Sequence, residues 1–364
     1  MKYTHRNILI AGLIVIIIIL GFLFFNNNNS SNEERRVDLN SPAFNTYDRS
    51  AVNEVDLSNE DNSLDVETSN DEKPHPMSIE ALRNNNYPGG DFIIIEELSN
   101  GYNYKRYIAS YISEGLEIDG LLTVPLMEEP EDGFPAIIFV HGYIPPKEYS
   151  SINSYPTYQA TLARAGFVTY KPDLRGHDKS EGEPVSAHFS EKYVIDTMNS
   201  ISYLKNYEAV DEESIGYWGH SNGGEIGLRV ILLSDDIKAA SFWAGVVGTY
   251  EDMFETYNDQ IPFLQDLSHE LIQENGLPSE NPKFWNDLEA HNYVEDISVP
   301  VEIQHSTGDE VVPIELSLSL KEALEENNKT IEYHEYQGGN HNISINSSLA
   351  WQRTIDFFNR YLED

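Results

Sequence analysis

Residues 214–233 read SIGYWGHSNGGEIGLRVILL, and this stretch decides the fold. Its first five residues are short, apolar and β-prone, which predicts a buried strand. From Gly224 onward the apolar residues recur at helical spacing, which predicts a helix. Between the two lies Gly219-His220-Ser221-Asn222-Gly223, a Gly-x-Ser-x-Gly pattern that at a strand-to-helix turn is typical of a nucleophile elbow.

Such an elbow suits nucleophilic chemistry at Ser221 for two reasons. The tight turn strains the serine backbone and projects its hydroxyl off the end of the sheet, while the glycines let neighbouring segments approach without a Cβ clash. The helix N-terminus places a backbone N–H and a positive dipole beside that hydroxyl. An ordinary glycine-rich turn is the alternative interpretation of the same residues.

Strand and helix patterns alternate along the rest of the domain. Residues 92–95, 104–112 and 116–125 predict an antiparallel meander. Further strands are predicted at residues 135–140, 167–170, 239–247, 299–305 and 329–336, and helices at 155–165, 190–206, 313–326 and 347–362. This alternation predicts an α/β fold with a mostly parallel, doubly wound sheet that binds ligands at the carboxyl ends of its strands. Residues 249–296, aromatic and acidic, break the rhythm and predict a small helical cap over the site.

A serine hydroxyl needs a base within hydrogen-bond reach, and the base needs an orienting acid. In such a sheet the chain order is serine, acid, histidine, with the last two on loops after successive strands. Asp309 directly follows the strand at 299–305, and His341 follows the strand at 329–336. We expect Asp309 to accept from Nδ1–H of His341, while Nε2 takes the Ser221 proton.

Several residues compete for these two roles, and chain order with loop position separates them from the favoured pair. Only His341 combines the order, a loop and flanking glycines. The rivals are His269 and His291 in the cap, His305 before the acid, His334 in mid-strand, and Glu310 beside Asp309.

The oxyanion that develops during acyl transfer needs two hydrogen-bond donors. One is expected to be the N–H of Asn222, the residue after the nucleophile, and the other the N–H of Tyr143, in the turn after the strand at 135–140. His141 in the same turn is expected to be a structural brace rather than an acid–base group.

The N-terminal residues predict attachment to a membrane. Residues 8–25 form an apolar run of about the length that spans a bilayer, and Lys2 and Arg6 precede it. We expect residues 1–25 to be an uncleaved signal-anchor that leaves the catalytic domain at the cell membrane on the extracytoplasmic side; a cleaved secretory signal is the alternative. Residues 26–74, rich in Asn, Ser, Asp and Glu, predict an acidic disordered linker, and residues 75–364 the folded domain.

Composition narrows the classes of partner and cofactor. The formal net charge of −38 argues against nucleic acid. Cysteine is absent, so no disulfide, thiolate nucleophile or thiolate-held metal can form. The chain also lacks histidine and aspartate at zinc-type spacing, so neither a metal nor another cofactor is expected. The expected partners are a small-molecule or peptide acyl substrate and, through the N-terminal helix, a membrane.

A set of motifs spread over the domain resembles a known family. They are residues 120–125, His141-Gly142, residues 173–182, 219–223 and 308–313, and His341. From about Ile93 to the C-terminus the chain is similar to the α/β-hydrolase superfamily, and more narrowly to the catalytic domain of prolyl oligopeptidase family serine peptidases and their dienelactone-hydrolase-like and esterase relatives. The resemblance implies an α/β-hydrolase fold with Ser221 as nucleophile, Asp309 as acid and His341 as base. It implies Tyr143 and Asn222 as oxyanion donors.

The departures from the family pattern concern substrate rather than catalysis. Asp178 and Ser306 stand where glycines are usual, and neither touches the reacting atoms. The β-propeller of prolyl oligopeptidases is expected to be absent, which leaves peptides or amides and small esters as alternative substrates. The hypotheses are therefore a prolyl oligopeptidase-like serine peptidase, a carboxylesterase, and, from another class, a non-catalytic membrane-anchored binding module.

Overall fold

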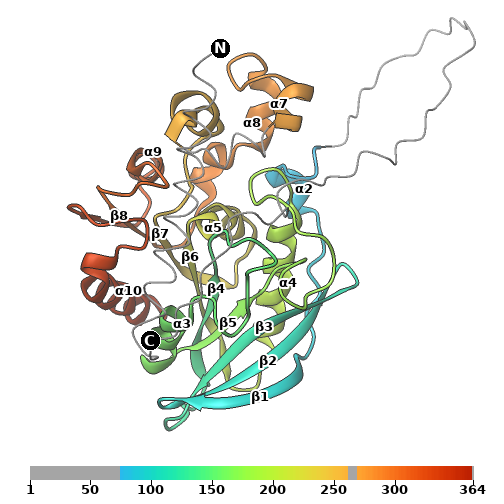
Figure 1. The fold of residues 1–364 in the computed structure, drawn as a ribbon, viewed down its shortest axis with the longest axis vertical. Helices are drawn as coiled ribbons and strands as arrows, with labels where there is room; N and C mark the ends of the chain where they lie inside the picture. The colour runs from blue at the N-terminus through green and yellow to red at the C-terminus, as the bar shows by residue number, and fades with distance from the viewer. Residues whose placement is uncertain (1–73, 261–268, 363–364) are drawn as a thin grey trace, which may run out of the picture. The chain divides into compact units, whose positions relative to one another are not determined.

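The computed structural model describes residues 74–260 and 269–362 of the chain (Figure 1). The predicted signal-anchor at residues 1–25 and all of the predicted linker except Pro74 lie outside these ranges. Among the described residues, no helix has both the length and the apolar character that a bilayer span requires.

One nine-stranded sheet organises the domain, in the order β1-β2-β3-β5-β4-β6-β7-β8-β9. Strands β1 to β3 form the predicted antiparallel meander, and β3 is also antiparallel to β5. From β5 to β9 every neighbouring pair is parallel, which confirms the predicted mostly parallel sheet. The strands are β1 (Ile93–Gly101), β2 (Tyr104–Ser113), β3 (Leu116–Pro125), β4 (Phe134–Val140), β5 (Val168–Pro172), β6 (Val210–His220), β7 (Ile237–Trp243), β8 (Val301–Ser306) and β9 (Ile331–Tyr336).

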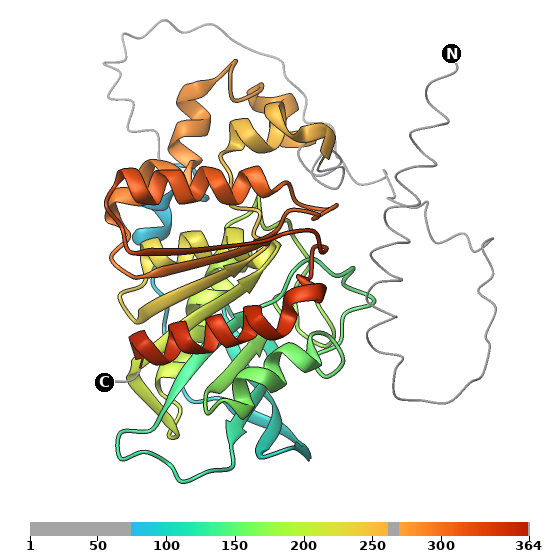
Figure 2. The same cartoon turned by 90° about the vertical axis from the view of Figure 1, so that its left-hand side faces the viewer.

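Helices cover both faces of the parallel part of the sheet (Figure 2). They are α3 (Pro156–Arg164), α4 (Lys192–Lys205), α5 (Asn222–Leu233), α9 (Ile314–Glu326) and α10 (Ser347–Leu362), while the short α2 (Ile79–Arg83) packs on α5. Helices α3 and α10 pack on one face, and α4, α5 and α9 on the other. This arrangement is the doubly wound architecture that the alternating pattern predicts.

The central strand β6 is buried on both faces, because successive side chains of a strand point in opposite directions. Tyr217 and Trp218 are both fully buried. Tyr217 points to the α5 face, where its hydroxyl donates to the Gly223 carbonyl at 2.6 Å. Trp218 points to the other face and stacks on Phe139 of β4 and Trp351 of α10. The apolar run before the elbow is thus the centre of the core.

The segment between β7 and β8 is the helical insertion predicted at residues 249–296. It contains a π-helical turn (Asp252–Thr256), α7 (His269–Asn275), α8 (Pro282–Leu288) and 3₁₀ turns at Asn258–Gln260 and Ala290–Asp296. Tyr250, Phe254 and Trp285 pack ring against ring in its core. Val312 and Leu316 belong to the same hydrophobic cluster. The insertion therefore packs on the segment that follows β8, a few residues after Asp309.

The predicted strand at residues 239–247 is too long at its C-terminal end. Strand β7 ends at Trp243 because Ala244 has a φ of 47°, which an extended strand cannot contain. The Ala244 N–H nevertheless donates to the Gln304 carbonyl at 2.8 Å. Ala244 to Val247 stay fully buried. Their apolar character, which suggested a longer strand, reflects burial rather than strand pairing.

Candidate functional site

Ser221 sits in the predicted turn between β6 and α5 in a strained backbone conformation. Its φ of 56° and ψ of −117° are uncommon for a residue with a side chain. Its N–H donates to the Trp243 carbonyl at 3.0 Å, and its carbonyl accepts from the N–H groups of Gly224 at 2.8 Å and Val246 at 3.2 Å. These bonds hold the strained turn in place, as expected of an elbow.

The two glycines that frame the elbow are sites of close backbone approach. A Cβ atom on Gly219 would lie 2.3 Å from the Gly223 carbonyl oxygen, and one on Gly223 would lie 2.3 Å from the Val140 carbonyl oxygen. Any side chain would force β6, α5 and β4 apart. The predicted reason for glycine at both positions is therefore confirmed.

Asp309 lies in the turn after β8, and its buried carboxylate is held by backbone and side-chain donors. Its Oδ1 accepts from the N–H groups of Val311 at 2.8 Å and Val312 at 3.0 Å. Its Oδ2 lies 2.8 Å from Nδ1 of His341, which follows β9. The structure thus brings together two of the residues that the sequence singles out, although 32 positions separate them.

A second imidazole contacts the same carboxylate. Nε2 of the fully buried His305 lies 3.0 Å from Asp309 Oδ2 and 3.1 Å from the Val312 carbonyl oxygen. A carbonyl can only accept, so Nε2 carries a proton, while Nδ1 lies 2.8 Å from the Ser317 hydroxyl. The sequence offers His305 only as a rival base, although its position near the end of β8, four residues before Asp309, is a signal for this contact.

The surroundings of Asp309 keep its carboxyl group ionised. Burial alone would raise the pKa of Asp309, but His341 and His305 together hold that pKa well below its usual range. The carboxylate is therefore ionised near neutral pH. A charged acceptor fixes the His341 tautomer with the proton on Nδ1 and a free lone pair on Nε2.

The turn after β4 lies against the nucleophile, as expected of an oxyanion turn. A Cβ atom on Gly142 would lie 3.0 Å from Cβ of Ser221. Tyr143, the next residue, is 58% exposed. On the other side, Asn222 begins α5, where a helix leaves its first N–H groups without intrahelical partners. The backbone segments of both expected donors therefore flank Ser221.

His141 sits beneath this turn, between two backbone carbonyls. Its Nδ1 lies 2.8 Å from the Gly142 oxygen and its Nε2 3.3 Å from the Asp173 oxygen. Burial lowers the pKa of His141 to about 3, so its ring is neutral and donates to only one of these two carbonyls. This environment agrees with the predicted role of His141 as a brace.

Two buried ionisable residues, Lys171 of β5 and Asp173 just after that strand, anchor the segment that follows the oxyanion turn. The Asp173 carboxylate accepts from the hydroxyls of Tyr149, at 2.9 Å, and Ser151. Lys171 donates to the carbonyls of Ser151 at 2.9 Å and Ser154. Burial raises the pKa of Asp173 and lowers that of Lys171. The sequence shows the Asp173 motif but not that it holds the oxyanion segment.

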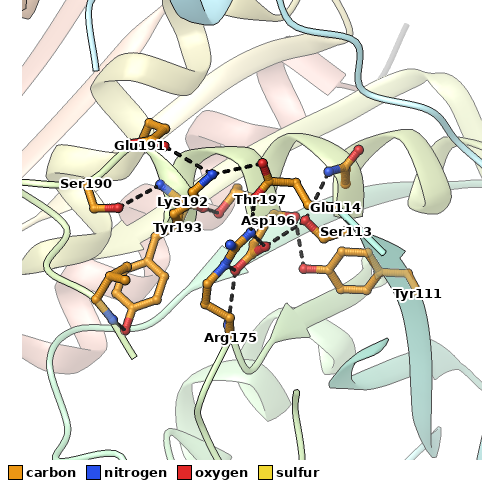
Figure 3. Close-up of polar contacts among 12 residues, drawn as sticks. Tyr111, Ser113, Glu114, Arg175, Ser190, Glu191, Lys192, Tyr193, Asp196 and Thr197 are labelled. Carbon is orange, nitrogen blue, oxygen red and sulfur yellow. Dashed lines mark hydrogen bonds and ion pairs between the residues drawn. The ribbon is translucent and has the colours of Figure 1, made fainter. Parts of the chain in front are cut away.

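A buried ion pair fixes the next part of the same loop (Figure 3). Arg175, 6% exposed, donates to the fully buried Asp196 of α4 through Nε at 2.9 Å and Nη2 at 2.6 Å. The Arg175 N–H and the Ser113 hydroxyl donate to the same carboxylate. Glu114, in the β2–β3 turn, is a second partner of Arg175 at 2.8 Å. The pair therefore joins the loop after β5, α4 and the meander.

Replacing Asp196 by asparagine is expected to lower the free energy of unfolding by about 3–5 kcal/mol, because Arg175 loses its buried counter-ion. Urea unfolding would measure this change. The matched control is Lys205→Met, also on α4, which removes a half-exposed ion pair with Asp236 and is expected to cost less than about 1 kcal/mol. Equal effects of the two substitutions would contradict the assigned importance of the buried pair.

No metal-binding cluster of three or more His, Asp or Glu side chains is found among residues 74–260 and 269–362. His188, which the sequence analysis did not single out, contacts the elbow: its Nε2 lies 3.2 Å from Oδ1 of Asn222. Burial lowers the pKa of His188 to about 4, so it is a neutral neighbour. The described residues around Ser221 thus offer hydroxyl, imidazole, carboxylate and backbone N–H groups.

Comparison with known proteins gives a family and a fold. The sequence model of the prolyl oligopeptidase family matches residues 153–364. A curated relative, the uncharacterized peptidase YtmA of Bacillus subtilis (strain 168), is 28% identical over 246 residues, which are 67% of this chain and 88% of that protein.

Two solved structures share the α/β-hydrolase fold. A puromycin-hydrolyzing peptidase of Mycobacterium tuberculosis superposes with a TM-score of 0.58 at 18% identity, over 71% of this chain and 40% of that one. An acetyl xylan esterase from Paenibacillus sp. R4 superposes with a TM-score of 0.61 at 17% identity, over 76% of this chain and 91% of that one. At these identities the likeness shows the fold alone.

Proposed function

The chain belongs to the prolyl oligopeptidase family of serine hydrolases, and from that premise we propose that it cleaves peptide, amide or ester bonds through an acyl-enzyme on Ser221, with His341 as base and Asp309 as acid. The observation that carries the proposal is the 2.8 Å contact between Asp309 Oδ2 and His341 Nδ1. Asp309 and His341 lie on the loops after successive strands, as the chain order of serine, acid and histidine in this family requires. Ser221 occupies a strained elbow before them in the chain.

In the proposed mechanism the Ser221 hydroxyl attacks the substrate carbonyl carbon while Nε2 of His341 takes its proton. The carbonyl oxygen becomes an oxyanion that accepts from the N–H groups of Asn222 and Tyr143, and losing one such donor costs about 10²–10³ in rate. The intermediate collapses when His341 returns the proton to the leaving amine or alcohol. Water, activated by the same imidazole, then releases the acyl group. Asp309 stays ionised and stabilises the imidazolium throughout.

Peptides or amides are the first substrate class that we propose. The matching family and the Bacillus subtilis relative YtmA both carry a peptidase name. A carboxylesterase is the second candidate, favoured by the superposition on an acetyl xylan esterase over 91% of that chain. Assays with aminoacyl and prolyl p-nitroanilides beside p-nitrophenyl acetate and butyrate would separate them. A protein that hydrolyses the esters and none of the anilides is an esterase.

A fluorophosphonate probe is expected to label the purified protein at Ser221, because the probe reacts with a serine that an adjacent base activates. Mass spectrometry of the labelled peptide identifies the modified residue, and heat-denatured protein is the control. Folded wild-type protein that resists the probe and hydrolyses no substrate would favour the other class of function, a non-catalytic binding module on a hydrolase fold.

We also propose attachment of this hydrolase to the cell membrane, with the catalytic domain on the extracytoplasmic side. The support is sequence alone: the apolar run at residues 8–25, preceded by Lys2 and Arg6. Cell fractionation after alkaline carbonate extraction tests it. Recovery of the full-length chain in the soluble fraction would refute the anchor.

A further inference from the structure

One buried imidazole connects three loops of the proposed site. His220, next to Ser221 at the end of β6, is 2% exposed. Its Nε2 lies 3.0 Å from the backbone carbonyl oxygen of His341. Its Nδ1 lies 2.7 Å from the Tyr155 hydroxyl, to which the Gly142 N–H donates at 3.0 Å. We name Gly142, Tyr155, His220 and His341 the His220 bridge.

The partners at both ends determine where each proton of the His220 bridge lies. A backbone carbonyl only accepts, so Nε2 of His220 must donate to His341. Burial lowers the pKa of His220 to about 3, so the ring is neutral and Nδ1 carries no proton. The Tyr155 hydroxyl therefore donates to Nδ1 and uses its oxygen to accept from Gly142. Every donor in the bridge points from the oxyanion turn toward the His341 loop.

Aromatic packing holds the His220 ring in this orientation. The ring lies nearly parallel to Trp218, with an interplanar angle of 9°, and stacks on Tyr158 at 29°. Its centroid is 4.6 Å from that of His341. Because Trp218 is fully buried and packs against the partly buried Tyr158 and against Trp351 of α10, the His220 ring cannot swing without disturbing this packing.

We infer that His220, supported by Tyr155, is a positioning residue that fixes the backbone of His341 relative to Ser221 and the oxyanion turn. The inference rests on the proposed function. Asp309 holds the His341 side chain at Nδ1, and His220 holds its main chain, so two attachments set where Nε2 lies. Gly338 and Gly339 before His341 both have positive φ values, a region that glycine adopts freely, so the bond from His220 adds a fixed point directly at His341.

The decisive variants are His220→Phe, which keeps an aromatic ring but no donor, and His220→Gln, whose amide can donate near the Nε2 position. His220→Phe is expected to lower kcat about 10–100-fold with KM changed less than about threefold, since small misplacements of a catalytic group have effects of this size. His220→Gln should recover most of the lost kcat. Tyr155→Phe should lower kcat less, because the bond from His220 to His341 remains.

Tyr170→Phe is the matched control, since it removes a buried tyrosine hydroxyl that donates to the Ala109 carbonyl at 2.9 Å, within the sheet and away from the bridge. Its kcat should equal that of the wild type. Retained kcat in both His220→Phe and Tyr155→Phe would overturn the inference. The inference would also be overturned if His220→Gln had no higher kcat than His220→Phe.

The ¹⁵N chemical shifts of wild-type His220 supply a readout that needs neither a variant nor a substrate. The bridge requires the neutral tautomer with its proton on Nε2, and a proton on Nδ1 would overturn it. Wild-type protein without activity or probe labelling would defeat the proposed function and the positioning role with it. Active wild type with unaffected His220 variants would defeat the positioning role alone.

Discussion

Replacing Ser221 by alanine is expected to lower kcat by about 10⁶-fold, since the covalent route disappears with the hydroxyl. Some catalysis over water should survive, because the oxyanion donors and the substrate contacts remain. The free energy of unfolding should change little. Alanine keeps the Cβ atom, so the strain at φ 56° is the same, and the three backbone hydrogen bonds of residue 221 do not involve the side chain.

The measurement is kcat on the best ester or anilide, together with fluorophosphonate labelling and urea unfolding of the same preparation. Ser214→Ala is the control, since Ser214 lies toward the opposite end of β6 and its hydroxyl donates to Asp211 at 2.6 Å. That variant should keep wild-type kcat and labelling. A Ser221→Ala protein that retains more than a tenth of the wild-type kcat would falsify the assignment of the nucleophile.

Replacing Asp309 by asparagine is expected to lower kcat by about 10⁴-fold with little effect on KM, because the wrong imidazole tautomer becomes favoured. The asparagine oxygen would remain on the Val311 and Val312 N–H groups, which places its NH₂ group where Oδ2 accepts now. The NH₂ group can only donate, so Nδ1 of His341 would have to accept from it and could carry no proton. The His341 proton would move to Nε2, and the imidazole could no longer take the proton of Ser221.

Steady-state kinetics of Asp309→Asn beside Glu310→Gln measures this effect. Glu310 is the exposed neighbour that competes for the role of acid in the sequence, and its substitution should leave kcat within about threefold of the wild type, as for an exposed side chain outside the site. Loss of activity in Glu310→Gln with retention in Asp309→Asn would reverse the assignment.

The stability of Asp309→Asn should also differ from that of the wild type in a pH-dependent way. The pKa of Asp309 is lowered in the folded protein, so its ionised form stabilises the fold above its unfolded pKa of about 3.9. This contribution is lost as pH falls toward the folded pKa. The stability difference between wild type and variant should therefore be present above about pH 4 and shrink as pH falls below it.

Local sequence determined much of this protein. The turn around Ser221 needs glycines on both sides because backbones cross there, and short-range patterning reveals both the strand and the helix that meet at it. The order of serine, acid and histidine along the chain follows from alternating strands and helices, so Asp309 and His341 could be placed on neighbouring loops. These are properties of single segments, and periodicity and turn chemistry record them directly.

Only the tertiary structure decided which segments meet. Alternation does not give the strand order, in which β5 pairs with both β3 and β4. Nor does it reveal that His305 is a second donor to Asp309 or that Asp196 neutralises Arg175. In the His220 bridge, His220 is separated from Tyr155 by 65 positions in the chain and from His341 by 121 positions. Such bonds form because packing of the whole sheet removes water from buried polar groups, which must then bond to one another. No local sequence pattern records which of these groups will meet.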